Sequence, residues 1–139
     1  MIGKKEKAAA LILRLFLGLT FFIHGFSKFQ GGISQTEKFF ESLGLPGFLG
    51  IVTAVIELAG GIAVILGLGT RLVSALFALL MLGAIVKVKL NSGFMGGYEF
   101  ELALFVISVY FIFANQSLPA LDRVIFRSKN ADQDEKVSA

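Results

Sequence analysis

Four long apolar stretches occupy most of this chain, and each is close to the length that a helix needs to cross a membrane. They cover residues 8–26, 48–68, 72–90 and 102–118. A membrane-spanning helix takes about 20 predominantly apolar residues. A soluble bundle of 139 residues has too little polar surface to cover four such helices. The sequence therefore predicts an all-α fold, an integral membrane four-helix bundle.

Composition supports this class and excludes several kinds of chemistry. Apolar residues make up 55% of the chain, and the mean hydropathy is +0.80. Without cysteine the chain has neither a disulfide nor a thiolate metal site, and its one histidine excludes bis-histidine haem ligation within a single chain. Phosphate-binding and dinucleotide-binding motifs are also missing. We predict no metal, no intrinsic cofactor and no nucleic-acid partner.

The basic residues predict an orientation. One side of the predicted bundle carries Lys4, Lys5, Lys7, Arg71, Arg123, Arg127, Lys129 and Lys136, whereas the other carries Lys28, Lys38, Lys87 and Lys89. Short cytoplasmic segments are richer in lysine and arginine, so both termini are expected in the cytoplasm. Residues 1–7 would form a cytoplasmic tail and residues 8–121 the membrane domain. Residues 122–139 are polar without apolar periodicity, which predicts a disordered cytoplasmic tail next to membrane lipid.

The first outer loop contains a predicted short interfacial helix over residues 34–43. Ser34 and Glu37 have the spacing of a capping box. Phe39, Phe40 and Leu43 fall on one face of this helix. Such a helix either covers the bundle as an ordinary amphipathic segment or forms a lid over a site.

Charged side chains inside the apolar stretches are the main functional clue, because they are costly in hydrocarbon and usually face the bundle interior. Glu57 leans outward along its helix, whereas His24 and Lys87 lean inward from theirs. We therefore expect Glu57 to face the interior within reach of His24 or Lys87. Arg14 and Arg71 are expected to be structural or lipid-facing charges.

The outer half of the bundle gathers more ionisable groups than one buried pair needs. The ligand-binding or proton-handling candidates are His24, Lys28, Glu57, Lys87, Glu99 and Glu101. We expect a cavity open to the outer leaflet, with Phe21, Phe22 and Phe94 as walls and Glu57 as floor. Each candidate also has a structural alternative, because ion pairs that only hold helices together look the same in a sequence. Small residues mark expected helix contacts, at Gly18, Gly25, Gly60, Gly61 and Gly83.

The order and spacing of several short motifs resemble the DoxX family of small four-helix bacterial membrane proteins. The motifs are Arg14-x3-Gly18, His24-Gly25-x2-Lys28, Leu45-Pro46, Glu57-x2-Gly60-Gly61, Gly67-Leu68-x-Thr70-Arg71, Gly93-Phe94, Tyr98-Glu99 and Leu121-Asp122. The resemblance covers residues 8–122. It departs from the family pattern at residues 115–119, where a glycine-rich exit is expected.

The resemblance implies a multipass protein of the bacterial cytoplasmic membrane, loosely associated with oxidoreductase systems that include quinone-linked thiosulfate oxidation. The matching positions are Arg14, His24, Lys28, Glu57 and Glu99. The family gives none of them an established catalytic role.

Two functions are compatible with these observations. The first is a membrane subunit of an oxidoreductase system that binds a quinone or a small phenolic or sulfur compound near the outer leaflet, while a redox partner protein carries the electrons. The second is a binding, transport or assembly protein without chemistry. A co-purifying flavin, haem or iron–sulfur partner would favour the first, and solute flux in liposomes the second.

Overall fold

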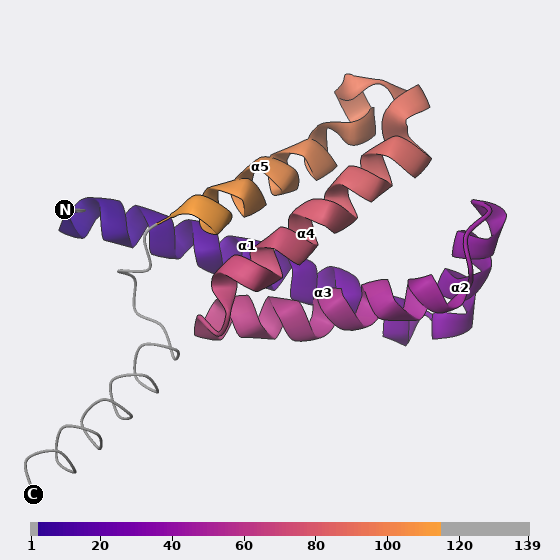
Figure 1. Ribbon diagram of the computed structural model, residues 1–139, viewed down its shortest axis with the longest axis horizontal. Helices are drawn as coiled ribbons and strands as arrows, with labels where there is room; N and C mark the ends of the chain where they lie inside the picture. Colours follow the sequence, from indigo (N-terminus) through magenta and orange to yellow (C-terminus); the bar gives the residue numbers. More distant parts are fainter. Residues whose placement is uncertain (1–2, 115–139) are drawn as a thin grey trace, which may run out of the picture.

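The computed structural model describes residues 3–114, and every regular element in that range is helical (Figure 1). The order is α1 (Lys4–Gln30), α2 (Ile33–Ser42), α3 (Phe48–Leu66), α4 (Thr70–Ala84), the π-helix η1 (Ile85–Lys89), the 3-10 helix η2 (Leu90–Ser92), the π-helical segment η3 (Phe94–Tyr98) and α5 (Glu99–Phe113). The predicted all-α fold is confirmed. The predicted fourth stretch beyond residue 114 and the tail over residues 122–139 lie outside the described residues.

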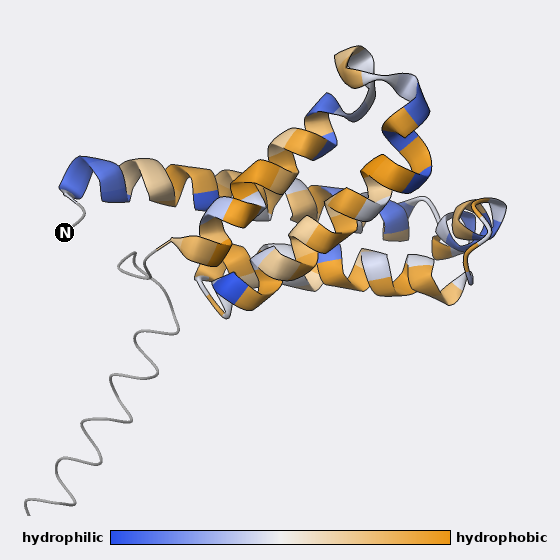
Figure 2. Ribbon diagram, turned by 45° about the horizontal axis from the view of Figure 1, so that its top comes forward, coloured by the Kyte–Doolittle hydropathy of each residue, from blue (hydrophilic) through white to orange (hydrophobic). Residues whose placement is uncertain are grey.

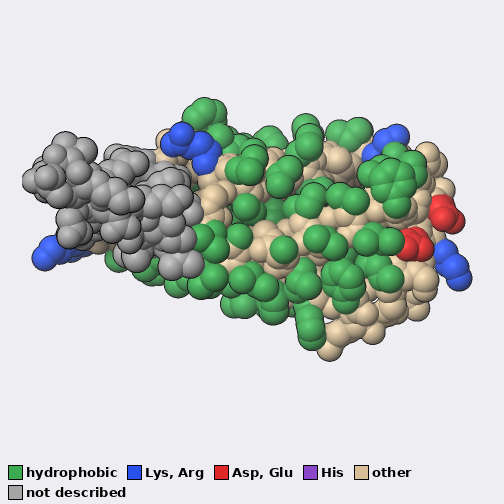
Figure 3. Space-filling model, turned by 60° about the horizontal axis from the view of Figure 1, so that its bottom comes forward, with side chains coloured by type: hydrophobic (Ala, Val, Ile, Leu, Met, Phe, Trp, Pro, Cys, Tyr) green, Lys and Arg blue, Asp and Glu red, His purple; other side chains and the backbone are tan. Residues whose placement is uncertain are grey.

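Four helical stretches are long and apolar enough to span a bilayer, as predicted. They are Lys4–Gln30, Phe48–Leu66, Thr70–Ser92 and Phe94–Phe113. Apolar residues dominate the middle of these helices (Figure 2). On the surface seen in Figure 3, the charged side chains gather at the two ends and an apolar surface lies between them. This distribution matches a hydrocarbon layer between two polar interfaces, so the chain is a multipass membrane protein.

The predicted interfacial helix is confirmed as α2, but its predicted start is wrong. The helix begins at Ile33 after Gly32, and no side chain caps it. Gly32 has a φ of 91°, a conformation that glycine adopts without the steric cost of a Cβ atom. The N-cap is therefore Gly32, two residues before the Ser34 that a capping box requires.

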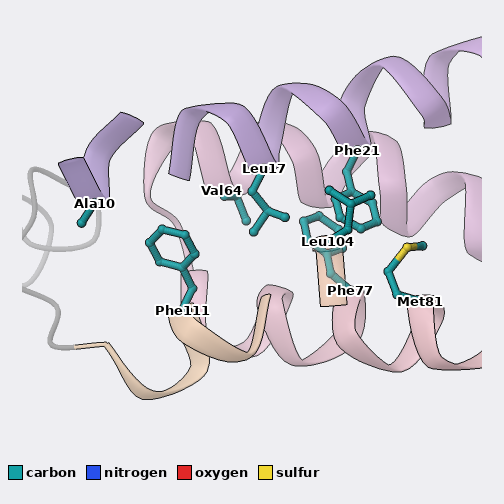
Figure 4. Packing of buried hydrophobic residues seen from close by; sticks show 8 residues of the cluster. All are labelled: Ala10, Leu17, Phe21, Val64, Phe77, Met81, Leu104 and Phe111. Carbon is teal, nitrogen blue, oxygen red and sulfur yellow. The ribbon is translucent and has the colours of Figure 1, made fainter. Parts of the chain in front are cut away.

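The helices form two close pairs, α1 with α3 and α4 with α5, which meet in a shared apolar core. The rings of Phe21 from α1 and Phe77 from α4 stack with their centroids 3.8 Å apart. Leu17, Val64 and Phe111 pack in the same core, toward the end where α3 turns into α4 (Figure 4). Toward the α2 end, where α1 finishes and α3 begins, the two pairs diverge (Figure 1).

Glycine allows α1 and α3 to approach with their backbones almost in contact. A Cβ atom at Gly61 would lie 2.6 Å from the carbonyl oxygen of Gly18, and one at Gly25 would lie 2.5 Å from the backbone nitrogen of Leu58. Gly60 faces the other way, where a Cβ atom would meet the Phe77 ring at 2.9 Å. Gly83 differs from the expectation, because nothing lies within 4 Å of a Cβ atom placed there.

The expectation of a lipid-facing or structural charge divides between the two arginines. Arg71 is exposed at the start of α4. Arg14 is only 4% exposed, so it lies inside the bundle instead of facing lipid. A guanidinium buried in a membrane protein is stabilised by protein groups around it, because hydrocarbon offers it no hydrogen bonds.

The orientation of the bundle stays a prediction and can be measured by labelling. Single cysteines placed at Ser34, which lies on α2, and at Lys5, near the start of α1, are both exposed. With both termini inside, a membrane-impermeant thiol reagent should label intact cells at position 34 and not at position 5. Because the chain has no cysteine of its own, the unmodified protein is the blank. Labelling at position 5 and not at position 34 would show that the orientation is the reverse of the predicted one.

Candidate functional site

A partly buried ion pair joins α1 to α3 near the α2 end of the bundle. Lys28 Nζ lies 2.6 Å from Glu57 Oε2, and the two side chains are 26% and 6% exposed. Lys28 is in the last turn of α1, where the helix dipole favours a positive charge. The close approach of the two helices at Gly25, three residues before Lys28, brings the lysine toward α3.

The expected partner of Glu57 was wrong, although its burial was predicted. Glu57 is 4% exposed and faces the bundle interior. It pairs with Lys28 rather than with His24 or Lys87. The reason is the length of the side chain. From one turn beyond His24, the long lysine side chain can reach back along the helix to the carboxylate, whereas the imidazole of His24 is too short. The His24 ring packs instead against Phe100 of α5, with centroids 5.7 Å apart.

A cavity of about 500 Å³ opens beside this ion pair; it is called the large cavity here. Its walls come from α2, α3, α4 and η1, with Lys28 from α1. Most of the walls are apolar, and the residues lining it are Lys28, Gln35, Thr36, Phe39, Phe40, Leu43, Leu45, Thr53, Glu57, Leu79, Leu80, Met81, Gly83, Ala84, Lys87, Val88 and Lys89. The volume falls within the range of about 300–1,000 Å³ that is usual for small-molecule sites.

A small cavity of about 160 Å³ lies on the other side of the ion pair. It is lined by Phe21, His24, Lys28, Glu57, Met81, Ala84, Phe100, Glu101 and Leu104. Lys28 and Glu57 line both cavities, so the ion pair stands between them. The structure thus brings five of the six candidates to the two cavities, namely His24, Lys28, Glu57, Lys87 and Glu101.

Glu99 is the candidate that the structure leaves apart. It is exposed and lines neither cavity. Its Oε1 accepts a hydrogen bond of 3.0 Å from the backbone N–H of Gly96. Gly96 has a φ of 69°, so Glu99 fastens the turn that leads into α5.

The walls of the large cavity differ from those expected. Phe22 and Phe94 line neither cavity, and Phe21 lines only the small one. The aromatic walls of the large cavity are Phe39 and Phe40 of α2. The signal for them was the apolar face of the loop helix, which fits a lid over a site. Whether this face only covers the bundle or lines a cavity depends on how far the two helix pairs diverge.

The end of the third span is irregular where it passes the cavity. Lys87 and Lys89 lie in the π-helix η1, and both line the large cavity. A π turn inside a helix often marks a functional position. Lys89 Nζ is 3.9 Å from Glu101 Oε1 of α5.

Within residues 3–114, no group of three or more histidine, aspartate and glutamate side chains is arranged to hold a metal ion. Four of the site's ionisable groups form two ammonium–carboxylate pairs, Lys28–Glu57 and Lys89–Glu101, beside apolar walls. The chemistry that this arrangement supports is hydrogen bonding to, and proton exchange with, the oxygen of a ligand.

Fold and site define a small multipass membrane protein whose four spans enclose a partly buried ion pair beside an apolar cavity. The chain belongs to the DoxX family, whose sequence profile matches residues 9–90. It is 44% identical to "Putative oxidoreductase CatD" of Bacillus subtilis over 128 residues, which are 92% of this chain and 95% of that protein.

Two further relatives are membrane proteins matched over shorter stretches. The chain is 34% identical to "Uncharacterized membrane protein Rv3486" of Mycobacterium tuberculosis over 65% of its own length and 56% of that protein. It is 32% identical to "Inner membrane protein YqjF" of Escherichia coli over 53% of its own length and 55% of that protein. No solved structure matches the chain significantly.

Proposed function

We propose that this protein is a membrane subunit of an oxidoreductase system, in the bacterial cytoplasmic membrane, and that its large cavity binds a quinone or a small phenolic or sulfur compound. The observation that carries the proposal is an apolar cavity of about 500 Å³ that ends at a buried, paired carboxylate. The name of the Bacillus subtilis relative supports the redox part.

The cavity offers both apolar surface and hydrogen-bond donors, which an aromatic ligand with oxygen substituents requires. Phe39, Phe40 and Leu80 offer apolar surface to a ring. Lys28 has three N–H donors and uses one on Glu57. A second donor can reach a ligand oxygen, and the ion pair with Glu57 keeps the ammonium in place.

Redox turnover of such a ligand needs a partner. Reduction of a quinone to a quinol consumes two electrons and two protons. A partner protein carrying a flavin, haem or iron–sulfur group supplies the electrons in this proposal. Residues of this chain bind the ring, hold its oxygen and exchange protons with it. Purification under mild detergent should retain a protein with such a chromophore, and visible absorption spectra detect it.

Substitution of Gly83 tests the binding site directly. Gly83 lines the cavity and has open space where a Cβ atom would project, so Gly83→Leu fills the cavity without a clash. We expect the variant to bind 1,4-naphthoquinone at least about tenfold more weakly than the unmodified protein, measured by equilibrium dialysis in detergent. Its folding should be unimpaired, since leucine favours a helix over glycine.

The matched control is Ala75→Leu. Ala75 is exposed on α4 and lines neither cavity. It adds the same side chain to the same helix away from the site, so naphthoquinone binding should be unchanged. Equal binding by Gly83→Leu and the unmodified protein would contradict the proposed site.

A further inference from the structure

The large cavity carries an excess of positive charge. Lys28, Lys87 and Lys89 line it, whereas Glu57 is its one carboxylate. Glu101 adds a negative charge from α5, 3.9 Å from Lys89. Two lysines therefore have a carboxylate partner, and Lys87 has no ion-pair partner among the described residues.

We infer that the ligand of this cavity is an anion, a ring compound bearing an ionised oxygen or an acid group, and that Lys87 binds that charge. The inference rests on the proposed function, because it specifies the ligand of the same cavity. Lys87 is exposed where it lines the cavity, so its ammonium is accessible to a ligand. A counter-charge stabilises a charge beside apolar walls. Within residues 3–114, the protein supplies counter-charges for Lys28 and Lys89 and leaves that of Lys87 to a ligand.

The neighbourhood of Lys87 leaves room for such a group. Gly83 precedes it by four residues, so the two lie on one face of the helix. Nothing lies within 4 Å of a Cβ atom placed at position 83, so glycine leaves open space there. The Lys28–Glu57 pair lines the same cavity. A ring bound there meets apolar side chains, and the cavity offers it the ammonium groups of Lys28 and Lys87.

Two ring compounds that differ by one ionised oxygen test the inference. 1,4-Naphthoquinone is neutral, and 2-hydroxy-1,4-naphthoquinone is an enolate at neutral pH. We expect the purified full-length protein to bind the enolate about tenfold or more tightly than the neutral quinone, the size of one charge-assisted hydrogen bond. Equilibrium dialysis in a neutral detergent measures both dissociation constants.

Lys87→Gln keeps hydrogen bonding on a side chain one atom shorter and removes the charge. It should abolish the preference for the enolate, so that the two compounds bind this variant with dissociation constants equal within about twofold. Lys87→Arg should restore the preference. Lys38→Gln is the matched control, because Lys38 is an exposed lysine of α2 outside both cavities, and it should behave as the unmodified protein.

Each other outcome has a definite meaning. Equal binding of the two compounds by the unmodified protein, or an unchanged preference in Lys87→Gln, overturns the anionic ligand and leaves the proposed ring site standing. No binding of either compound overturns both. Displacement of the bound enolate by phosphatidylglycerol at a similar concentration assigns the positive charge to lipid headgroups and overturns the inference.

Discussion

Gly61→Leu is expected to prevent the bundle from forming. A Cβ atom at this position would lie 2.6 Å from the Gly18 carbonyl oxygen and 2.6 Å from the Phe22 backbone nitrogen. Both are backbone atoms of α1, so no side-chain rotation relieves the clash and the two helices must separate. Overpacking typically costs about 1–3 kcal/mol and occasionally more, and separation also loses the close packing on which helix association in membranes depends.

The measurement is the yield of monodisperse protein in detergent and its thermal unfolding midpoint. Gly83→Leu is the control, because it makes the same substitution in a spanning helix where nothing lies within 4 Å. That variant should accumulate normally and unfold at the same temperature or slightly higher. Normal yield and stability of Gly61→Leu would show that α1 and α3 do not pack as described.

Removing one member of the Lys28–Glu57 pair is expected to destabilise the protein unequally. Lys28→Met leaves the 6%-exposed Glu57 side chain without its partner, and breaking a buried pair in this way costs about 3–5 kcal/mol. Glu57→Gln should cost less. The remaining lysine is 26% exposed, and its long stem allows the ammonium to reach polar surroundings.

The double variant tests whether the two side chains stabilise the protein as an ion pair or independently of each other. Lys28→Met combined with Glu57→Gln leaves neither charge, so it should be more stable than Lys28→Met alone, although it carries one more substitution. Thermal unfolding of the four proteins gives the coupling between the two residues. Additive losses would mean that the two side chains do not form a pair in the membrane protein.

Loss of the pair should also affect function in a recognisable way. In the proposed site, the Lys28 ammonium binds a ligand oxygen and Glu57 orients it. The double variant should therefore be stable enough to purify and bind naphthoquinone more weakly. A purely structural pair predicts the opposite, with binding unchanged once stability is restored.

Parts of the site were predictable from the sequence because they depend on the cost of charge in hydrocarbon. A glutamate in the middle of an apolar stretch must face protein, and Glu57 does. The contacts of Gly18, Gly25 and Gly61 were also predictable, because small residues beside each other allow helices to approach closely. The apolar face of the loop helix predicted that α2 covers either the bundle or a site.

The identity of contacts was harder to predict, because it depends on the rotation and divergence of the helices. Lys28 was assigned with other lysines to one side of the bundle, and the structure pairs it with Glu57. Arg14 was expected to be a structural or lipid-facing charge, and the structure buries it. Gly83 was predicted to mark a helix contact, as was Gly61, but nothing lies within 4 Å of a Cβ atom placed there.

The sequence by itself determined that this chain is a helical membrane protein with four spans, because span length and hydropathy are properties of single segments measured against the thickness of a bilayer. It also determined that charges such as Glu57 lie inside. Only the tertiary structure decided which lysine neutralises Glu57, and that Lys87 lines a cavity of about 500 Å³ and has no carboxylate partner among residues 3–114. The reason is physical: the divergence of the two helix pairs at the α2 end is a property of their packing as a whole, and no single span encodes it.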